Sequence, residues 1–208
     1  FILYHESNKG EYDYVVMKKL GPSIKDYFYA FNNKLKLSSI LKLAVQIVIR
    51  LEVIHSKGNT YNSFKLNHFL LDPETQSTVY LIDFGKVFDK NTFPYKYVEG
   101  ESYKFDYESN FKQFCRDDIE LFGYFLLALL GELSYYYFIS DYQYEFNYKF
   151  VNNNNNNNNN NINENVIKKL CEYIHYCRDL KKNNDMPNYQ HIISIFENIS
   201  QSELSKST

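Results

Sequence analysis

Residues 39–57 predict the clearest helix of this chain, and that helix most constrains the possible folds. Ser38 is a good N-cap and Gly58 a good stop, and no helix breaker lies between them. Its apolar residues cover most of the circumference: Ile40, Leu41, Leu43, Ala44, Val45, Ile47, Val48, Leu51, Val53 and Ile54. A helix that is apolar on nearly all sides is stable when it is buried. We therefore expect it in the middle of a larger α-rich body.

Composition agrees with a folded core of that kind. The chain has 208 residues, of which 44% are hydrophobic, enough for one large domain or two small ones. The net charge of -2 shows no excess of positive charge of the kind that binds nucleic acid or an anionic membrane. No apolar run reaches transmembrane length, and no signal-peptide pattern is present. The three cysteines, without a Cys-x-x-Cys pair, indicate a reduced intracellular protein, cytoplasmic or nuclear.

Shorter elements are expected on both sides of this helix. The predicted strands are residues 12–17, 69–71 and 79–82, and the last two are joined by a turn at 72–74. The other predicted helices are residues 23–31, capped by Ser23, 117–130, 165–181 and 189–200. Residues 86–114 show no clean period and predict a long loop.

Ten consecutive asparagines occupy positions 152–161. A pure asparagine tract cannot bury apolar surface, so it predicts a disordered insertion. Two interpretations remain open for it: a prion-like assembly segment, or a tolerated surface insertion, which we favour.

Two segments, 61–71 and 79–85, carry the motif with the most chemical content. They read Tyr-Asn-Ser-Phe-Lys-Leu-Asn-His-Phe-Leu-Leu and Val-Tyr-Leu-Ile-Asp-Phe-Gly. Their spacing resembles a protein-kinase catalytic loop, His-Arg-Asp and then Asn, followed by the Asp-Phe-Gly turn. Asp83 follows a short apolar run, where a carboxylate can emerge as a metal ligand, and Gly85 permits the tight turn after it.

Further segments resemble the casein kinase I family of Ser/Thr protein kinases, with the vaccinia-related kinases as near relatives. Residues 14–28 resemble the hinge of that family, and residues 54–57 resemble the entry to its catalytic loop. The segment Arg116-Asp-Asp-Ile-Glu-Leu-Phe-Gly-Tyr124 resembles the family's Arg-Asp-Asp-Leu-Glu-Ser-Leu-Gly-Tyr. Residues 177–180 and 187–189 resemble its closing motifs. The matches occur in the right order and cover almost the whole chain.

The resemblance implies an α+β, protein-kinase-like fold, mainly the helical C-lobe. It divides the chain into the end of the N-lobe with the hinge strand (1–20), the first part of the C-lobe (21–150), the Asn-rich insertion (151–164), the closing helices (165–200) and a tail (201–208). The glycine-rich loop and the ATP-binding lysine strand would lie before Phe1.

The same resemblance assigns roles around a nucleotide cleft. The implied binding positions are Met17 as gatekeeper, Lys18 and Leu20 at the hinge, Leu70 and Ile82 at the adenine floor, and Asp83 at the metal. Asp118 would brace the backbone of the catalytic loop.

Tyr61 and Asn62 replace the His-Arg of the catalytic loop, and two further positions, which carry the chemistry, also depart from the kinase pattern. Ser63 replaces the catalytic Asp and cannot act as a base near neutral pH, a loss of about 10²–10⁴-fold in rate. His68 replaces the metal-binding Asn, although magnesium prefers hard oxygen donors. We expect His68 to be a hydrogen-bonded histidine rather than a ligand. Lys65 remains at its position, where it either contacts phosphate or is a solvated charge.

Three hypotheses follow. The first, which we favour, is a casein kinase I-like pseudokinase that acts by binding or scaffolding protein partners, without a catalytic residue at 63, 65 or 68. The second is an active atypical kinase in which Asp106 replaces the base. The third is a truncated, non-functional kinase remnant. We expect ATP and magnesium to bind weakly or not at all, and no feature sets the oligomeric state.

Overall fold

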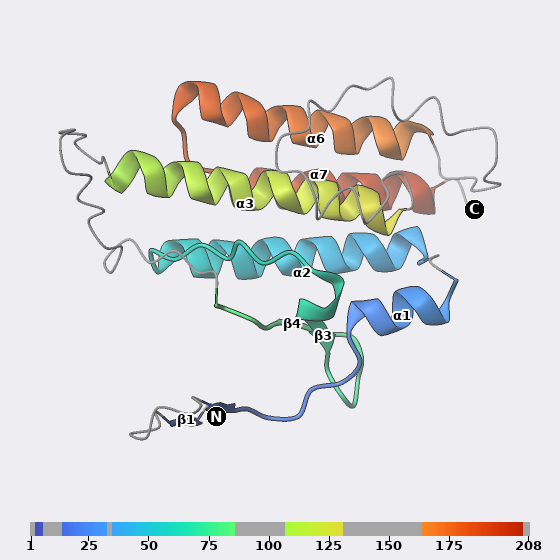
Figure 1. Ribbon diagram of the computed structural model, residues 1–208. Coiled ribbons are helices and arrows are strands. Elements are labelled where there is room, and N and C mark those ends of the chain that lie inside the picture. The colour runs from blue at the N-terminus through green and yellow to red at the C-terminus, as the bar shows by residue number, and fades with distance from the viewer. Residues whose placement is uncertain (1–2, 6–13, 33–34, 86–106, 131–163, 206–208) are drawn as a thin grey trace.

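Long helices stacked in layers make up most of the molecule (Figure 1). The computed structural model describes residues 3–5, 14–32, 35–85, 107–130 and 164–205. Its α-helices are α1 (Ile24–Ala30), α2 (Leu37–Ser56), α3 (Tyr107–Leu129), α6 (Glu164–Asn183) and α7 (Tyr189–Leu204), with a 3₁₀ turn, η1 (Leu66–His68). Its strands are β1 (Leu3–His5), β2 (Tyr14–Val16), β3 (Phe69–Leu71) and β4 (Val79–Leu81). The mainly helical body with short antiparallel strand pairs is α+β, as predicted.

The core lies between α2, α3, α6 and α7. In Figure 1, α6 forms the outer layer, α3 and α7 lie below it, and α2 follows. Gly123 allows α3 to approach α6 closely, because a Cβ there would lie 2.7 Å from Ile174 Cγ1. Phe122 on α3 meets Phe196 on α7 edge to face, with ring centroids 6.1 Å apart. Large apolar side chains therefore join the layers at the centre of the stack.

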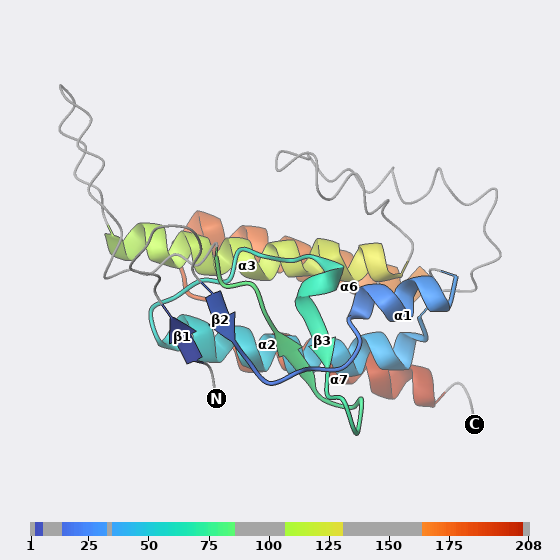
Figure 2. The same ribbon diagram turned by 60° about the horizontal axis from the view of Figure 1, so that its bottom comes forward.

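Both strand pairs lie on the α2 side of the stack, away from α6 (Figure 2). Strands β3 and β4 are antiparallel, with Phe69 opposite Leu81 and Leu71 opposite Val79. Asp72 organises the turn between them, because its Oδ1 accepts from the Thr75 backbone N–H at 2.9 Å. The predicted strands at 69–71 and 79–82 are thus confirmed to within one residue. Strand β1, which pairs with β2, was not predicted.

The segment before α1 lies against β3. Gly21 N donates to Leu71 O at 2.9 Å, and Leu71 N donates to Pro22 O at 2.9 Å. A Cβ at Gly21 would lie 2.8 Å from Leu71 O, so this close approach requires glycine. Ser23 then caps α1 in a capping box with Asp26, which confirms the predicted helix and its cap.

Two helix starts differ from the prediction. Helix α2 begins at Leu37 after Lys36, which makes no side-chain capping bond, so Ser38 lies inside the helix and is not its N-cap. Helix α3 begins at Tyr107, so the prediction of a loop through residue 114 is wrong for 107–114, and Asp118 lies within the helix. The added turns are stabilised because Phe111 and Cys115, four residues apart, are both buried.

The central position predicted for α2 is confirmed for one face only. Ala44, Ile47, Val48 and Leu51 are fully buried. Ile49 and Val53 lie on the outer face of α2 and are 43% and 50% exposed. Helix α2 therefore carries more apolar side chains than the core covers.

Two predictions fall outside the described residues: the disorder predicted for the asparagine tract and the part of the predicted loop at 86–106. The boundaries of the proposed chain divisions remain predictions. The three cysteines are buried free thiols. Within the described ranges, no helix combines the length and apolar character needed to cross a bilayer.

Candidate functional site

The two motif segments lie side by side and are joined through Ile82. The Ile82 backbone N–H donates to His68 O at 3.0 Å, and the Ile82 carbonyl accepts from Tyr61 Oη at 2.8 Å. The predicted adenine-floor residue is thus a junction between the loop and the Asp-Phe-Gly turn. The β3–β4 ladder places His68 and Ile82 at adjacent ends of the two strands.

Tyr61 fixes this junction with its ring as well as its hydroxyl. The ring is fully buried and meets Phe64, Phe69 and Phe84 edge to face, with centroids 5.4 Å, 6.0 Å and 5.6 Å away. Burial, and then the charges of Asp83 and Asp118, raise the pKa of Tyr61 well above its usual range. The phenol therefore stays protonated and remains a donor to the Ile82 carbonyl.

Ser63, His68 and Asp83 form one polar cluster. Ser63 Oγ lies 2.9 Å from His68 Nδ1, and His68 Nε2 lies 3.1 Å from Asp83 Oδ2. Ser63 contacts this cluster twice more, because its carbonyl lies 3.0 Å from His68 Nδ1 and its Oγ lies 3.4 Å from Asp83 Oδ2. With the Nε2 proton facing the carboxylate, Nδ1 accepts from the serine hydroxyl. His68 therefore has a polar partner at each of its ring nitrogens.

A hydroxyl, an imidazole and a carboxylate in this order are also the three groups of a catalytic triad, in which the hydroxyl is the nucleophile. The exposure of the three side chains argues against that chemistry. Ser63 is 2% exposed and His68 6%, whereas the Asp83 side chain is 45% exposed. A nucleophile must reach its substrate, but here the hydroxyl is the buried end and the carboxylate the open end. The arrangement is that of a structural clasp, and we name Ser63, His68 and Asp83 the clasp.

Asp83 itself has an unusual backbone. Its φ of 60° lies in the left-handed region, which disfavours residues other than glycine but is more accessible to Asp and Asn. Its Oδ1 receives a long hydrogen bond from the Gly85 N–H at 3.4 Å. With His68 at Oδ2, both carboxylate oxygens have partners from the chain itself.

The residues around Asp83 do not fit the magnesium ion that the resemblance implies. Magnesium requires near-octahedral oxygen coordination, and the nearest side chain here presents an imidazole nitrogen. In the part of the chain that the structure describes, no group of three or more His, Cys, Asp or Glu could hold a metal ion.

A second polar cluster fixes the backbone of the same loop. Asp118 is fully buried, and its carboxylate accepts from Tyr61 N at 2.6 Å and from Asn62 N at 2.7 Å. His55 Nε2 lies 2.8 Å from Asp118 Oδ2, and the hydroxyl of Tyr189 lies 2.5 Å from His55 Nδ1. We name His55, Asp118 and Tyr189 the brace. Asp118 thus makes the contacts expected of it.

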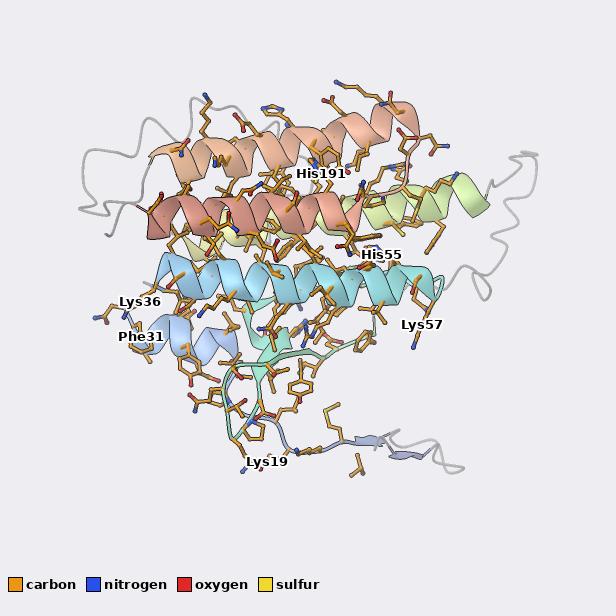
Figure 3. The ribbon with its side chains drawn as sticks, turned by 180° about the vertical axis from the view of Figure 1, so that it is seen from behind. Lys19, Phe31, Lys36, His55, Lys57 and His191 are labelled. Carbon is orange, nitrogen blue, oxygen red and sulfur yellow. The ribbon has the colours of Figure 1, made fainter. Side chains whose placement is uncertain are left out.

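His55 and Tyr189 were not assigned a role from the sequence. His55 lies near the C-terminal end of α2, on the side that faces α7 (Figure 3). The available signal was its place in the last turn of an apolar helix, four residues after the buried Leu51. A histidine buried there needs a hydrogen-bond partner, but only the fold identifies that partner as Asp118.

The remaining predicted site residues lie around β3. Lys18 is exposed, whereas Leu20, Lys65 and Leu70 are half-buried. The pKa of Asp72 is lowered chiefly by the hydrogen bond from the Thr75 N–H, and the charge of Lys18 adds to this effect. Lys18 therefore lies close enough to the β3–β4 turn for its charge to influence Asp72. The structure brings Ser63, His68, Ile82 and Asp83 together at one place.

No protein-family model matches the chain.

Proposed function

We propose that this chain is a catalytically inactive relative of the casein kinase I family, a kinase-like C-lobe that acts by binding or scaffolding protein partners. The observation that carries the proposal is the clasp. Ser63 and His68, at the positions of the base and the metal-binding amide, are buried and bonded to each other and to Asp83. Phosphoryl transfer needs those positions free for a substrate hydroxyl and a metal ion.

The brace supports the same proposal. The buried carboxylate of Asp118 accepts hydrogen bonds from two backbone N–H groups of the loop. These bonds hold the loop conformation whichever side chains the loop carries at positions 63 and 68. Selection for a folded binding module would maintain these contacts, because losing them leaves buried donors unpaired. The clasp adds order to the same segment and has a serine, in place of a carboxylate, at the position of the base.

Exposed apolar side chains near the site favour protein partners. Phe84, next to Asp83, is 50% exposed even though one side of its ring meets Tyr61. Val16 and Met17, at the expected hinge, are 50% and 46% exposed. Exposed aromatic and methionine side chains are enriched where proteins associate.

The test is a radiolabelled ATP assay with magnesium and either casein or an acidic peptide. The wild-type chain should incorporate no more label than Asp83→Ala, because neither contains a positioned base. A known casein kinase in parallel shows that the assay detects transfer. Clear incorporation by the wild type that disappears in Asp83→Ala would overturn the proposal in favour of an active atypical kinase.

A further inference from the structure

The contact between His68 and Asp83 bears on more than the loss of catalysis. Asp83 Oδ2 is the oxygen that faces the loop, and both His68 Nε2, at 3.1 Å, and Ser63 Oγ, at 3.4 Å, are directed to it. The imidazole is held in place because its other nitrogen lies 2.9 Å from the Ser63 hydroxyl and 3.0 Å from the Ser63 carbonyl. The ring is 6% exposed, so it has little freedom to turn away.

From this geometry we infer that His68 has taken the place of a divalent cation at Asp83 and excludes one from it. This inference rests on the proposed function, since it explains how a kinase-like site keeps its order without nucleotide. The imidazole N–H, whose hydrogen carries a partial positive charge, interacts with the carboxylate in place of a metal ion. It also holds Asp83 in its left-handed conformation, at a φ of 60°.

An amide at position 68 should therefore open the site. In His68→Asn the imidazole no longer reaches Oδ2, and an amide oxygen, a hard ligand, becomes available beside the carboxylate. We expect Mn²⁺, used as a spectroscopic substitute for Mg²⁺, to bind His68→Asn at least about tenfold more tightly than the wild type. The gain should disappear in the double variant His68→Asn/Asp83→Asn.

The experiment is a titration with Mn²⁺ followed by electron paramagnetic resonance of the free ion. The matched control is His175→Asn, which makes the same substitution at an exposed position on α6 and should bind like the wild type. His68→Gln, with its amide on a longer side chain, serves as a second variant in case His68→Asn does not fold. Circular dichroism confirms that each variant is folded before titration.

Three outcomes would overturn the inference. The first is a wild type that binds Mn²⁺ as tightly as the folded amide variants, because the imidazole then excludes nothing. The second is binding of Mn²⁺ that is tighter in the wild type, because His68 is then a ligand. The third is no binding in either folded amide variant, because the exclusion then has another cause. Each concerns metal binding alone, whereas the proposed function fails only if the wild type transfers phosphate.

Discussion

The brace and the clasp lie on the same loop, but they differ in burial and in the number of their donors. The Asp118 carboxylate is fully buried and accepts from two backbone N–H groups and from His55. The Asp83 carboxylate is 45% exposed, and its nearest donor is His68. The brace fixes the path of the backbone, and the clasp lies at the positions that the proposed kinase resemblance assigns to catalysis. Under that proposal, loop conformation and reactivity depend on different residues, so one can be lost while the other remains.

Removing the charge of the brace should have the largest effect. In Asp118→Asn, the amide cannot accept from Tyr61 N, Asn62 N and His55 together, because one of its two acceptor oxygens has become a donor. A buried donor left without its charged acceptor costs about 1–3 kcal/mol, and three donors are affected, so the loss is a large part of the stability of an ordinary domain. Urea unfolding at pH 7 measures the free energy, and amide exchange at Tyr61 and Asn62 reports the loop.

The matched control for this variant is Asp179→Asn. Asp179 pairs with Lys182 at 2.7 Å on the exposed side of α6, where both side chains are mostly in solvent. An exposed ion pair of this kind contributes little, so the unfolding midpoint should stay near that of the wild type. If both variants lose the same stability, the brace is no stronger than a surface pair and the comparison fails.

Helix periodicity and turn chemistry were largely readable in the sequence. Ser23, the β3–β4 turn and the apolar face of α2 follow local rules of capping, loop geometry and burial. The start of α3 differs from the prediction at residue 117, because Asp117 and Asp118 look like the acidic first turn of a helix, whereas Asp118 lies mid-helix as a partner for the loop. A charge placed for a tertiary contact cannot be distinguished from one placed for a helix dipole by sequence alone.

The sequence predicted which residues lie at the site, but not which hydrogen bonds join them. Ser63, His68 and Asp83 could be singled out because they occupy motif positions. Their mutual bonding depends on how η1 and β4 meet, and that meeting is set by the β3–β4 register. His55 and Tyr189 lay outside this reasoning, because they are 134 residues apart and only the packing of α2 against α7 joins them.

The next largest effect is expected at Glu120, on the same helix as Asp118 but directed to α6. Its carboxylate pairs with Lys181 at 2.6 Å and with Arg178 at 2.9 Å. Burial alone would raise the pKa of Glu120, but these pairs and the Tyr124 hydroxyl outweigh it and leave the pKa below the ordinary 4.5. Glu120→Gln should therefore lose about 1.5–3 kcal/mol at pH 7.

The pH dependence distinguishes this ion pair from a packing effect. A carboxyl whose pKa is depressed in the folded state stabilises the fold above its unfolded pKa, and that contribution is lost as the pH falls through the folded pKa. The gap between wild type and Glu120→Gln should thus be largest at neutral pH and shrink as the pH falls below the ordinary glutamate pKa of 4.5. Paired urea titrations across that range measure it, and a constant gap would contradict the assignment.

A smaller effect is expected where the brace and the clasp meet, at Tyr61. Tyr61→Phe keeps the aromatic contacts with Phe64 and Phe84 but removes the hydroxyl that donates to Ile82 O. We expect a loss of about 1 kcal/mol, and faster amide exchange at Ile82. Tyr80→Phe on β4 is the control, since its hydroxyl makes only a 3.4 Å contact with Asp72 at an exposed position. Equal losses in the free energy of unfolding of the two variants would show that the hydrogen bond to Ile82 O contributes no more to stability than the surface contact.

The smallest effect is expected at Ser63, although the proposed kinase resemblance places it at the position of the catalytic base. Ser63→Ala removes the hydroxyl that lies 2.9 Å from His68 Nδ1 but leaves the contact of 3.1 Å between His68 Nε2 and Asp83 Oδ2. That contact and the burial of the ring keep the imidazole oriented towards Asp83. The loss of stability should therefore stay below about 1 kcal/mol. Urea unfolding and the histidine ring ¹⁵N shifts measure this, and a loss as large as that of Asp118→Asn would mean that the Ser63 hydroxyl, rather than the contact between His68 and Asp83, holds the clasp together.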